Sequence, residues 1–136
     1  MNTSGFIRVI PSVLVAAVLV AMPALAQPSG SAVECVDGKF GDHIEDGHVV
    51  GDAGSVFAAR KAVYWVDVRN PGEPTEVTLV WTIDGKEIQR QSLEVGRSPH
   101  WHTWGMRPFG GGGTVEVEVL DASGASLRKD SIRRVP

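Results

Sequence analysis

Cysteine is almost absent from this chain, since Cys35 is the only one in 136 residues. A single thiol excludes a disulfide within the chain, so the fold must be stabilised by a hydrophobic core. Four Trp residues and many Val residues supply the side chains for such a core. Because Cys35 is flanked by Val33 and Val36, we expect it to be a buried strand residue rather than a reactive thiol.

The short motifs of common catalytic sites are also missing. The chain has no G-x-S-x-G nucleophile elbow, no H-E-x-x-H helix and no Cys–His pair near a glycine turn. Glu116 and Glu118 form a pair of carboxylates, but they alternate along an expected strand, which is typical of a solvated face. We therefore expect a protein that is not an enzyme.

Basic residues are not in excess: 13 Lys and Arg residues stand against 16 Asp and Glu residues, a formal net charge of −3. Residues 27–136 lack Arg8, so they carry 12 basic residues against 16 acidic ones and a net charge of −4. A mildly acidic domain has no electrostatic attraction for nucleic acid or for an anionic membrane surface. We therefore expect neither nucleic acid nor an anionic membrane surface as a partner.

The N-terminus has the pattern of a secretory signal peptide over residues 1–26. Arg8 is followed by an apolar run from Val13 to Met22, and Ala24-Leu25-Ala26 has the small-x-small cleavage pattern. The run is shorter than the roughly 20 residues that a membrane span needs. We therefore expect an exported protein, periplasmic or secreted, with no stable membrane span after cleavage and with residues 27–136 forming one domain.

The centre of the chain predicts a meander of antiparallel strands. In Glu76–Ile83 apolar residues fall on every second position, which is the period of a half-buried strand. Asp84-Gly85 follows, the strongest two-residue hairpin signal, and Lys86–Leu93 returns as a more polar strand that suits a sheet edge. A preceding strand is expected over residues 62–68, and a later one alternates through Val115, Val117 and Val119.

Taken together, about seven short strands with Gly, Pro and Asp turns predict an all-β, immunoglobulin-like antiparallel β-sandwich. A small open β-barrel is the alternative fold. Residues 55–136 are expected to form the body of the sandwich. Residues 27–54 are expected to hold an N-terminal strand and a long acidic, glycine-rich loop over residues 37–54, with a brief strand at Ile44 or at Val49-Val50. No segment has the apolar spacing of a helix.

Several motifs resemble a bacterial family designated domain of unknown function 2914. The likeness covers roughly Cys35 to Ile132 and is carried by Phe57 ahead of Val63-Tyr64-Trp65, Thr78-Leu79-Val80-Trp81 with Asp84-Gly85-Lys86-Glu87, Trp101-His102-Thr103-Trp104, and Val115–Val119 with Asp121-Ala122-Ser123-Gly124. The chain departs from the family pattern at His102, where the family has Arg, at Gly105, where it has Ser, and in a glycine run where it has Trp. The resemblance implies an exported or envelope-associated accessory domain with no established reaction.

The four histidines suggest a metal site as one alternative. His100 and His102 lie two residues apart on an expected strand, so both imidazoles face the same side. Two imidazoles are the beginning of a zinc site, and His43 or His48 from the acidic loop would supply a further ligand. The carboxylates of that loop suggest calcium as another ligand, but they lack the regular spacing of a calcium-binding loop.

The tryptophans suggest another alternative, a glycan- or peptidoglycan-binding module. Trp81 is in phase with the apolar positions of its strand and is expected in the core. Trp101 and Trp104 have opposite parity, so we expect one of the two to face solvent. The first expectation for function remains a non-enzymatic accessory domain without a cofactor, which binds a protein or cell-envelope partner through the edge at Lys86–Leu93 or at His100–Thr103.

Overall fold

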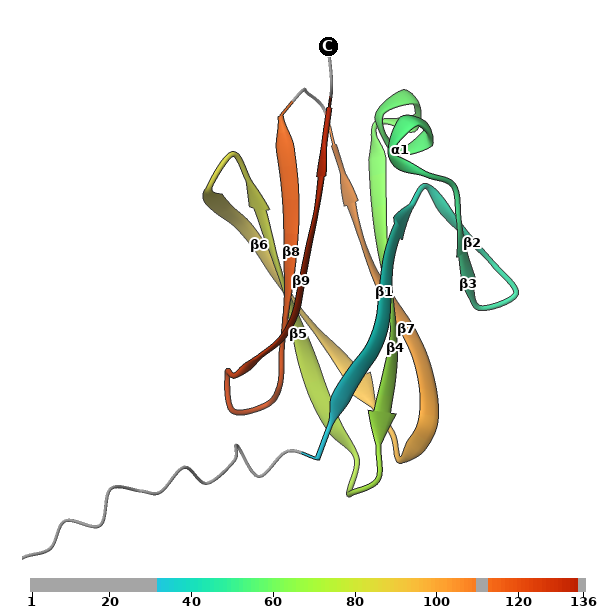
Figure 1. Ribbon diagram of the computed structural model, residues 1–136, viewed down its shortest axis with the longest axis vertical. Coiled ribbons are helices and arrows are strands. Elements are labelled where there is room, and N and C mark those ends of the chain that lie inside the picture. The colour runs from blue at the N-terminus through green and yellow to red at the C-terminus, as the bar shows by residue number, and fades with distance from the viewer. Residues whose placement is uncertain (1–31, 110–112, 135–136) are drawn as a thin grey trace, which may run out of the picture.

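The computed structural model describes residues 32–109 and 113–134, which form two antiparallel sheets packed face to face, with a small hairpin and a short helix at one side (Figure 1). The expected signal peptide, residues 1–26, lies outside the described residues. Among those that are described, no helix is both long and apolar enough to cross a membrane.

Nine strands and one helix make up the described part of the chain. In order they are β1 (Glu34–Gly41), β2 (His43–Glu45), β3 (His48–Val50), α1 (Ala53–Ala59), β4 (Lys61–Asn70), β5 (Thr75–Ile83), β6 (Lys86–Val95), β7 (Ser98–Pro108), β8 (Thr114–Leu120) and β9 (Ser126–Arg133). Strands β2 and β3 pair only with each other, and the other seven strands form the sandwich.

The strand order confirms an immunoglobulin-like sandwich. One sheet has the order β1-β4-β7 and the other has the order β6-β5-β8-β9, with antiparallel pairing throughout. With the seven strands lettered A, B, C, C′, E, F and G, this is A-B-E against C′-C-F-G, in which Greek-key connections cross between the sheets. The prediction of about seven strands holds for this body.

The core lies between the two sheets and is built by period-two alternation. Every second residue of β5 faces inward, and Val77, Leu79 and Trp81 are fully buried there. The side chains that face them come chiefly from β4 in the opposite sheet, while Val115, Val117 and Val119 of the neighbouring β8 share their inward face. Trp81 also buries its indole N–H without loss of a hydrogen bond, because Nε1 donates to Oε1 of Gln91 on β6 at 2.8 Å.

The long loop expected over residues 37–54 is replaced by regular structure, and the brief strand expected at Ile44 or at Val49-Val50 is present as the strands β2 and β3. Strand β1 extends to Gly41, and β2 and β3 form a hairpin closed by Asp46 and Gly47, both of which have positive φ (49° and 75°). This is the same Asp-Gly signal that correctly predicts the hairpin at Asp84-Gly85, whose φ values are 48° and 84°. The strands beside Asp46-Gly47 are only three residues long, so no alternation marks them.

The expectation that no segment forms a helix was also wrong. Helix α1 begins after Asp52, whose carboxylate accepts the N–H of Ser55 at 2.9 Å while the Ser55 hydroxyl accepts the N–H of Asp52 at 2.7 Å. This reciprocal capping box stabilises a helix start. The helix ends at Arg60, which adopts a left-handed conformation, and it buries Val56. Seven residues are too few to show an apolar period.

Candidate interaction surface on strand β7

Strand β7 is one of the two edge strands of the three-stranded sheet, and β1 is the other. It pairs with β4 in regular register from Trp101, opposite Val68, to Pro108, opposite Lys61. In the residues described, no strand pairs with its other side. The two edges expected from sequence, Lys86–Leu93 within β6 and His100–Thr103 within β7, are both confirmed as sheet edges.

The side of β7 that faces away from the core carries His100, His102, Trp104 and Met106. Trp104 and Met106 are 37% and 44% exposed, which is unusual for side chains of this size. Of the four large hydrophobic side chains that are exposed among residues 32–109 and 113–134, three lie on β7, and the fourth is Val36 on β1. The exposed apolar surface is therefore concentrated on one edge strand.

Trp101 lies on the opposite side of β7 from Trp104, as the parity predicts, but it is exposed as well. Its indole packs over Gly96 at the end of the sandwich, where an added Cβ on Gly96 would approach the ring to 2.7 Å. The core does not extend this far, so Trp101 remains 36% exposed. The expectation that only one of the two indoles faces solvent was wrong, because parity does not report where a sandwich ends.

An open groove of about 490 Å³ adjoins Trp101. It is lined by Pro74, Thr75, Glu76, Glu94, Val95, Gly96 and Trp101. Glu76 and Glu94 are direct cross-strand partners between β5 and β6, so the groove has an acidic wall beside an aromatic one. This groove provides room for individual side chains next to β7.

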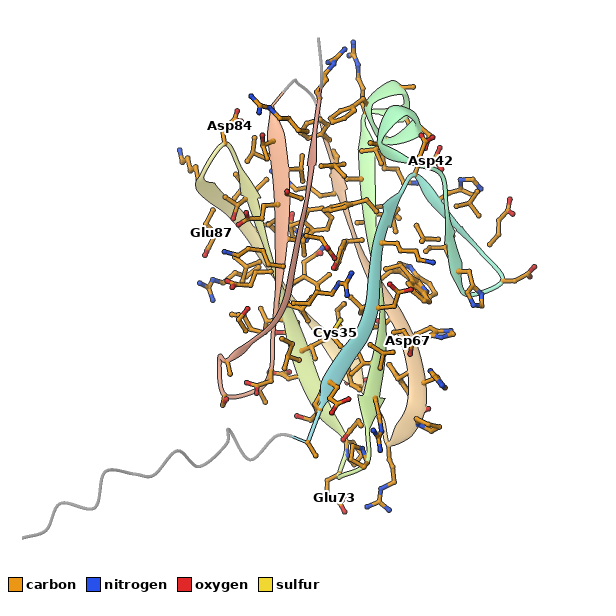
Figure 2. The ribbon with its side chains drawn as sticks, in the orientation of Figure 1. Cys35, Asp42, Asp67, Glu73, Asp84 and Glu87 are labelled. Atoms are coloured by element: carbon orange, nitrogen blue, oxygen red, sulfur yellow. The ribbon has the colours of Figure 1, made fainter. Side chains whose placement is uncertain are left out.

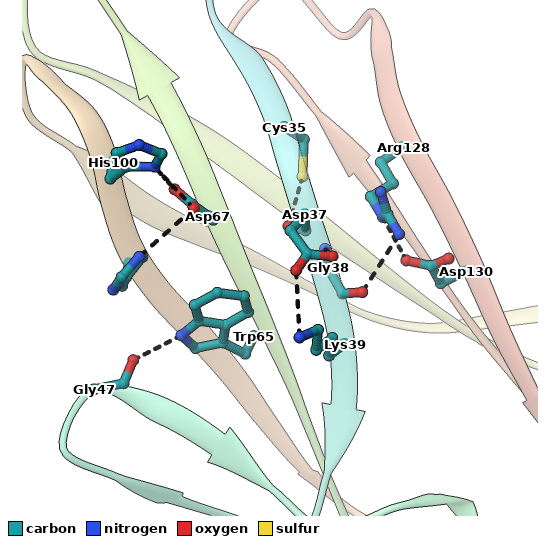
Figure 3. A network of polar contacts seen from close by, with 11 residues as sticks. Cys35, Asp37, Gly38, Lys39, Gly47, Trp65, Asp67, His100, Arg128 and Asp130 are labelled. Atoms are coloured by element: carbon teal, nitrogen blue, oxygen red, sulfur yellow. Dashed lines mark hydrogen bonds and ion pairs between the residues drawn. The ribbon is translucent and has the colours of Figure 1, made fainter.

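A buried carboxylate holds the two histidines of β7. Asp67 of β4 faces His102 across the ladder, and its Oδ2 lies 3.0 Å from Nδ1 of His100 and 3.7 Å from Nε2 of His102. Figure 3 shows His100 and Asp67 turned toward each other across the two strands. The prediction that the two imidazoles share one face is confirmed, whereas the contribution of Asp67 was not foreseen from sequence.

The β2–β3 hairpin covers the next part of this face. The indole N–H of Trp65 donates to the carbonyl of Gly47 at 2.7 Å (Figure 3). The His48 ring stacks on Trp65 with centroids 5.7 Å apart. The His48 and His102 rings meet edge to face at 4.9 Å. The hairpin is thus fixed to the sheet by a tryptophan and two histidines.

His43 does not join this group. Its Nδ1 lies 2.5 Å from Asp42 and its Nε2 lies 3.1 Å from Glu45, and these two hydrogen bonds raise the pKa of the imidazole. Figure 2 shows Asp42 on the hairpin side of the molecule, away from Asp67. Within residues 32–109 and 113–134, no group of three or more His, Cys, Asp and Glu side chains is arranged to hold a metal ion.

Charge distinguishes β7 from the other three sheet edges. Strand β1 carries three charged residues, and β6 and β9 carry four each, whereas β7 carries only Arg107. The charged residues are Glu34, Asp37 and Lys39 on β1, Lys86, Glu87, Arg90 and Glu94 on β6, and Arg128, Lys129, Asp130 and Arg133 on β9. Charges on edge strands oppose the addition of another strand. Strand β7 lacks that protection.

A polar cluster lies at the other side of the sandwich, where β1 faces β9. The Tyr64 hydroxyl donates to Asp130. Asp130 also accepts from Nε of Arg128 at 2.6 Å, and Arg128 reaches the carbonyl of Gly38 (Figure 3). Cys35 is half-buried nearby, and burial raises the pKa of its thiol to about 11. The thiol is therefore protonated and weakly nucleophilic at neutral pH, as expected for a structural cysteine.

Comparison of the sequence with protein-family models and with curated proteins gives no match to either. The resemblance to domain of unknown function 2914 stays a prediction from the motifs.

Proposed function

We propose that this protein is an exported, non-enzymatic binding module of the cell envelope, which holds a protein partner through strand β7. The observation that carries the proposal is the gathering of Trp101, Trp104 and Met106 on the one edge strand that is nearly free of charge. Aromatic residues and Met are enriched at protein interfaces, and Trp is prominent among the residues that dominate binding energy.

The arrangement of the indoles favours a protein over a glycan. A sugar-binding platform needs aromatic rings that present a common face to the ligand. Trp101 and Trp104 project to opposite sides of β7, so they do not form one flat platform. A folded or extended protein segment can contact both sides of an edge strand, and the groove beside Trp101 accommodates side chains from it.

The proposal is tested by capture from chemically cross-linked envelopes of the producing cells with the tagged full-length protein. We expect a specific protein partner, and we expect Trp104→Ala with Met106→Ala to lower its capture at least about tenfold, as loss of central interface residues does. The matched control is Val36→Ala, which truncates the exposed apolar residue of a different edge. Equal capture by wild type and the β7 variant would contradict the proposal.

A second set of measurements distinguishes this proposal from the two alternatives that the sequence suggests, a metal-binding protein and a glycan-binding module. Capture is repeated with a chelator, and the purified protein is sedimented with peptidoglycan. Loss of the partner with chelator would move the assignment to a metal-dependent protein. Cosedimentation that Trp104→Ala abolishes would move it to a glycan-binding module.

A further inference from the structure

We infer that the partner is an extended, strand-forming protein segment that pairs with the free backbone edge of β7 between His100 and Trp104. This inference rests on the proposed function and specifies how the same surface recognises its partner. In this mode main-chain hydrogen bonds supply affinity, and alternate side chains supply specificity.

The backbone of β7 is oriented for this pairing. In an antiparallel ladder, alternate residues turn both their N–H and their C=O toward the same neighbour. The carbonyl of Met106 accepts from the Gln91 side chain of β6 at 3.2 Å, and the N–H of His100 donates to the Ser98 hydroxyl at 3.1 Å, so both groups have partners outside β4. His102 and Trp104 share this phase, and their backbone groups therefore face the open edge.

The strand order leaves a place for an additional strand. In the constant-type immunoglobulin domain a strand D lies beside strand E, whose equivalent here is β7. Only Gly96 and Arg97 separate β6 from β7, so the chain crosses directly between the sheets at this point. The incoming segment would occupy the position of strand D and extend the three-stranded sheet.

The surroundings of the edge define the chemistry of the segment. Apolar contacts come from Trp104 and Met106 on one side of β7 and from Trp101 on the other. Glu76 and Glu94 line the groove and Asp67 lies under the histidines, so acidic side chains are disfavoured. A second copy of the chain brings the same net negative charge to the interface. We therefore commit to an apolar segment of a different protein that lacks acidic residues.

The test uses a phage-displayed library of random 12-residue peptides, selected against the folded full chain. We expect selected peptides with apolar residues at alternate positions and few Asp or Glu residues. The affinity of the best peptide is then compared for His102→Pro and His102→Val. Both variants lose the imidazole, but only Pro loses the N–H at the free edge, a position that an edge strand tolerates.

We expect His102→Pro to weaken the peptide at least about tenfold and His102→Val to change it less than about threefold, because one main-chain hydrogen bond and the approach of the strand are lost only with Pro. No enrichment from the library, or equal effects of the two variants, would overturn strand addition. Neither result bears on envelope capture by the Trp104→Ala, Met106→Ala variant, so the two proposals fail separately.

If His102→Pro does not fold, amide hydrogen exchange in the wild-type chain tests the inference instead. Bound peptide should slow exchange of the His102 and Trp104 amides in the wild-type chain. Unchanged exchange at both amides would overturn the inference. Sedimentation velocity of the chain alone tests whether a second copy of the chain occupies this edge instead. A dimer that Trp104→Lys disrupts would overturn the inference in favour of that second copy.

Discussion

Trp65 and Trp104 are direct partners across the β4–β7 ladder, and their side chains share the outer face of the three-stranded sheet, yet only one is buried. Trp65 is 5% exposed because the β2–β3 hairpin lies over it and accepts its indole N–H. No described segment lies over Trp104 in this way, and its side chain is 37% exposed. One residue fixes the hairpin, and the other is available to a partner.

Replacement of these two indoles should separate stability from binding. Trp65→Ala should lower the free energy of unfolding by about 3–5 kcal/mol, the usual cost of deleting a buried Trp side chain. Trp104→Ala should cost less than about 1 kcal/mol, because it removes a side chain that remains largely in contact with water. Urea denaturation followed by circular dichroism measures both, and equal losses would show that the hairpin does not protect Trp65.

Gly105 should not tolerate a side chain. An added Cβ would lie 2.3 Å from Oε1 of Gln91 and 2.7 Å from Cδ1 of the buried Leu79. Gly105→Ala should therefore cost about 1–3 kcal/mol through overpacking between the sheets. Gly72→Ala is the matched control, since its Cβ would meet only an ordinary contact at 3.6 Å from Asn70. A stable Gly105→Ala protein, in the same urea assay, would contradict the close approach of the sheets at this point.

The fold should weaken in alkaline solution. Burial, followed by the hydrogen bond to Asp130, raises the pKa of Tyr64, and burial raises the pKa of Cys35 to about 11. Because the neutral forms are favoured in the folded state, their contribution is complete below the ordinary values of 10.0 and 9.0 and is lost as the pH rises above them. We expect the free energy of unfolding to fall between pH 9 and pH 11, a window that these values set.

The double variant Tyr64→Phe, Cys35→Ala provides the control for that pH dependence. It removes both titrating groups while keeping similar side-chain volumes, so its unfolding free energy should change less over the same range. A parallel decline in the wild type and the double variant would assign the alkaline loss to other groups.

Asn70 should be required for the turn between β4 and β5. The side chain is 2% exposed, its Nδ2 donates to the carbonyl of Glu73 at 2.9 Å, and its Oδ1 accepts the N–H of Gly72 at 3.0 Å. Asn70→Ala should cost about 1–3 kcal/mol, because buried backbone groups lose their partners. Asn70→Asp keeps the acceptor and loses the donor, so thermal unfolding should show that it also destabilises the fold. An unchanged melting temperature for both variants would contradict this role.

The sandwich body could be predicted because its signals are local. Alternation in β5 and β8 and the Asp84-Gly85 turn specify strands, inward faces and a hairpin without reference to the rest of the chain. The pairing of β2 with β3 and the helix α1 escaped prediction, because these elements are short and depend on distant residues. Trp65 fixes the hairpin from β4, and Phe57 of α1 packs against Phe109, whose ring centroid lies 5.4 Å away.

The candidate surface could be predicted only in part. The common face of His100 and His102 follows from their spacing, and the edge positions of β6 and β7 follow from their composition. The proximity of Asp67 depends on register between strands that are separated in sequence. The exposure of Trp101 depends on where the sandwich ends, which no local pattern records.

The unequal distribution of charge over the four edges limits what can assemble on this molecule. Fibre growth by strand addition needs two receptive edges on each subunit, one to bind and one to be bound. Here three edges are charged and one is not. A strand added to β7 would therefore end the assembly at a stoichiometry of one to one, because the remaining edges oppose a further addition.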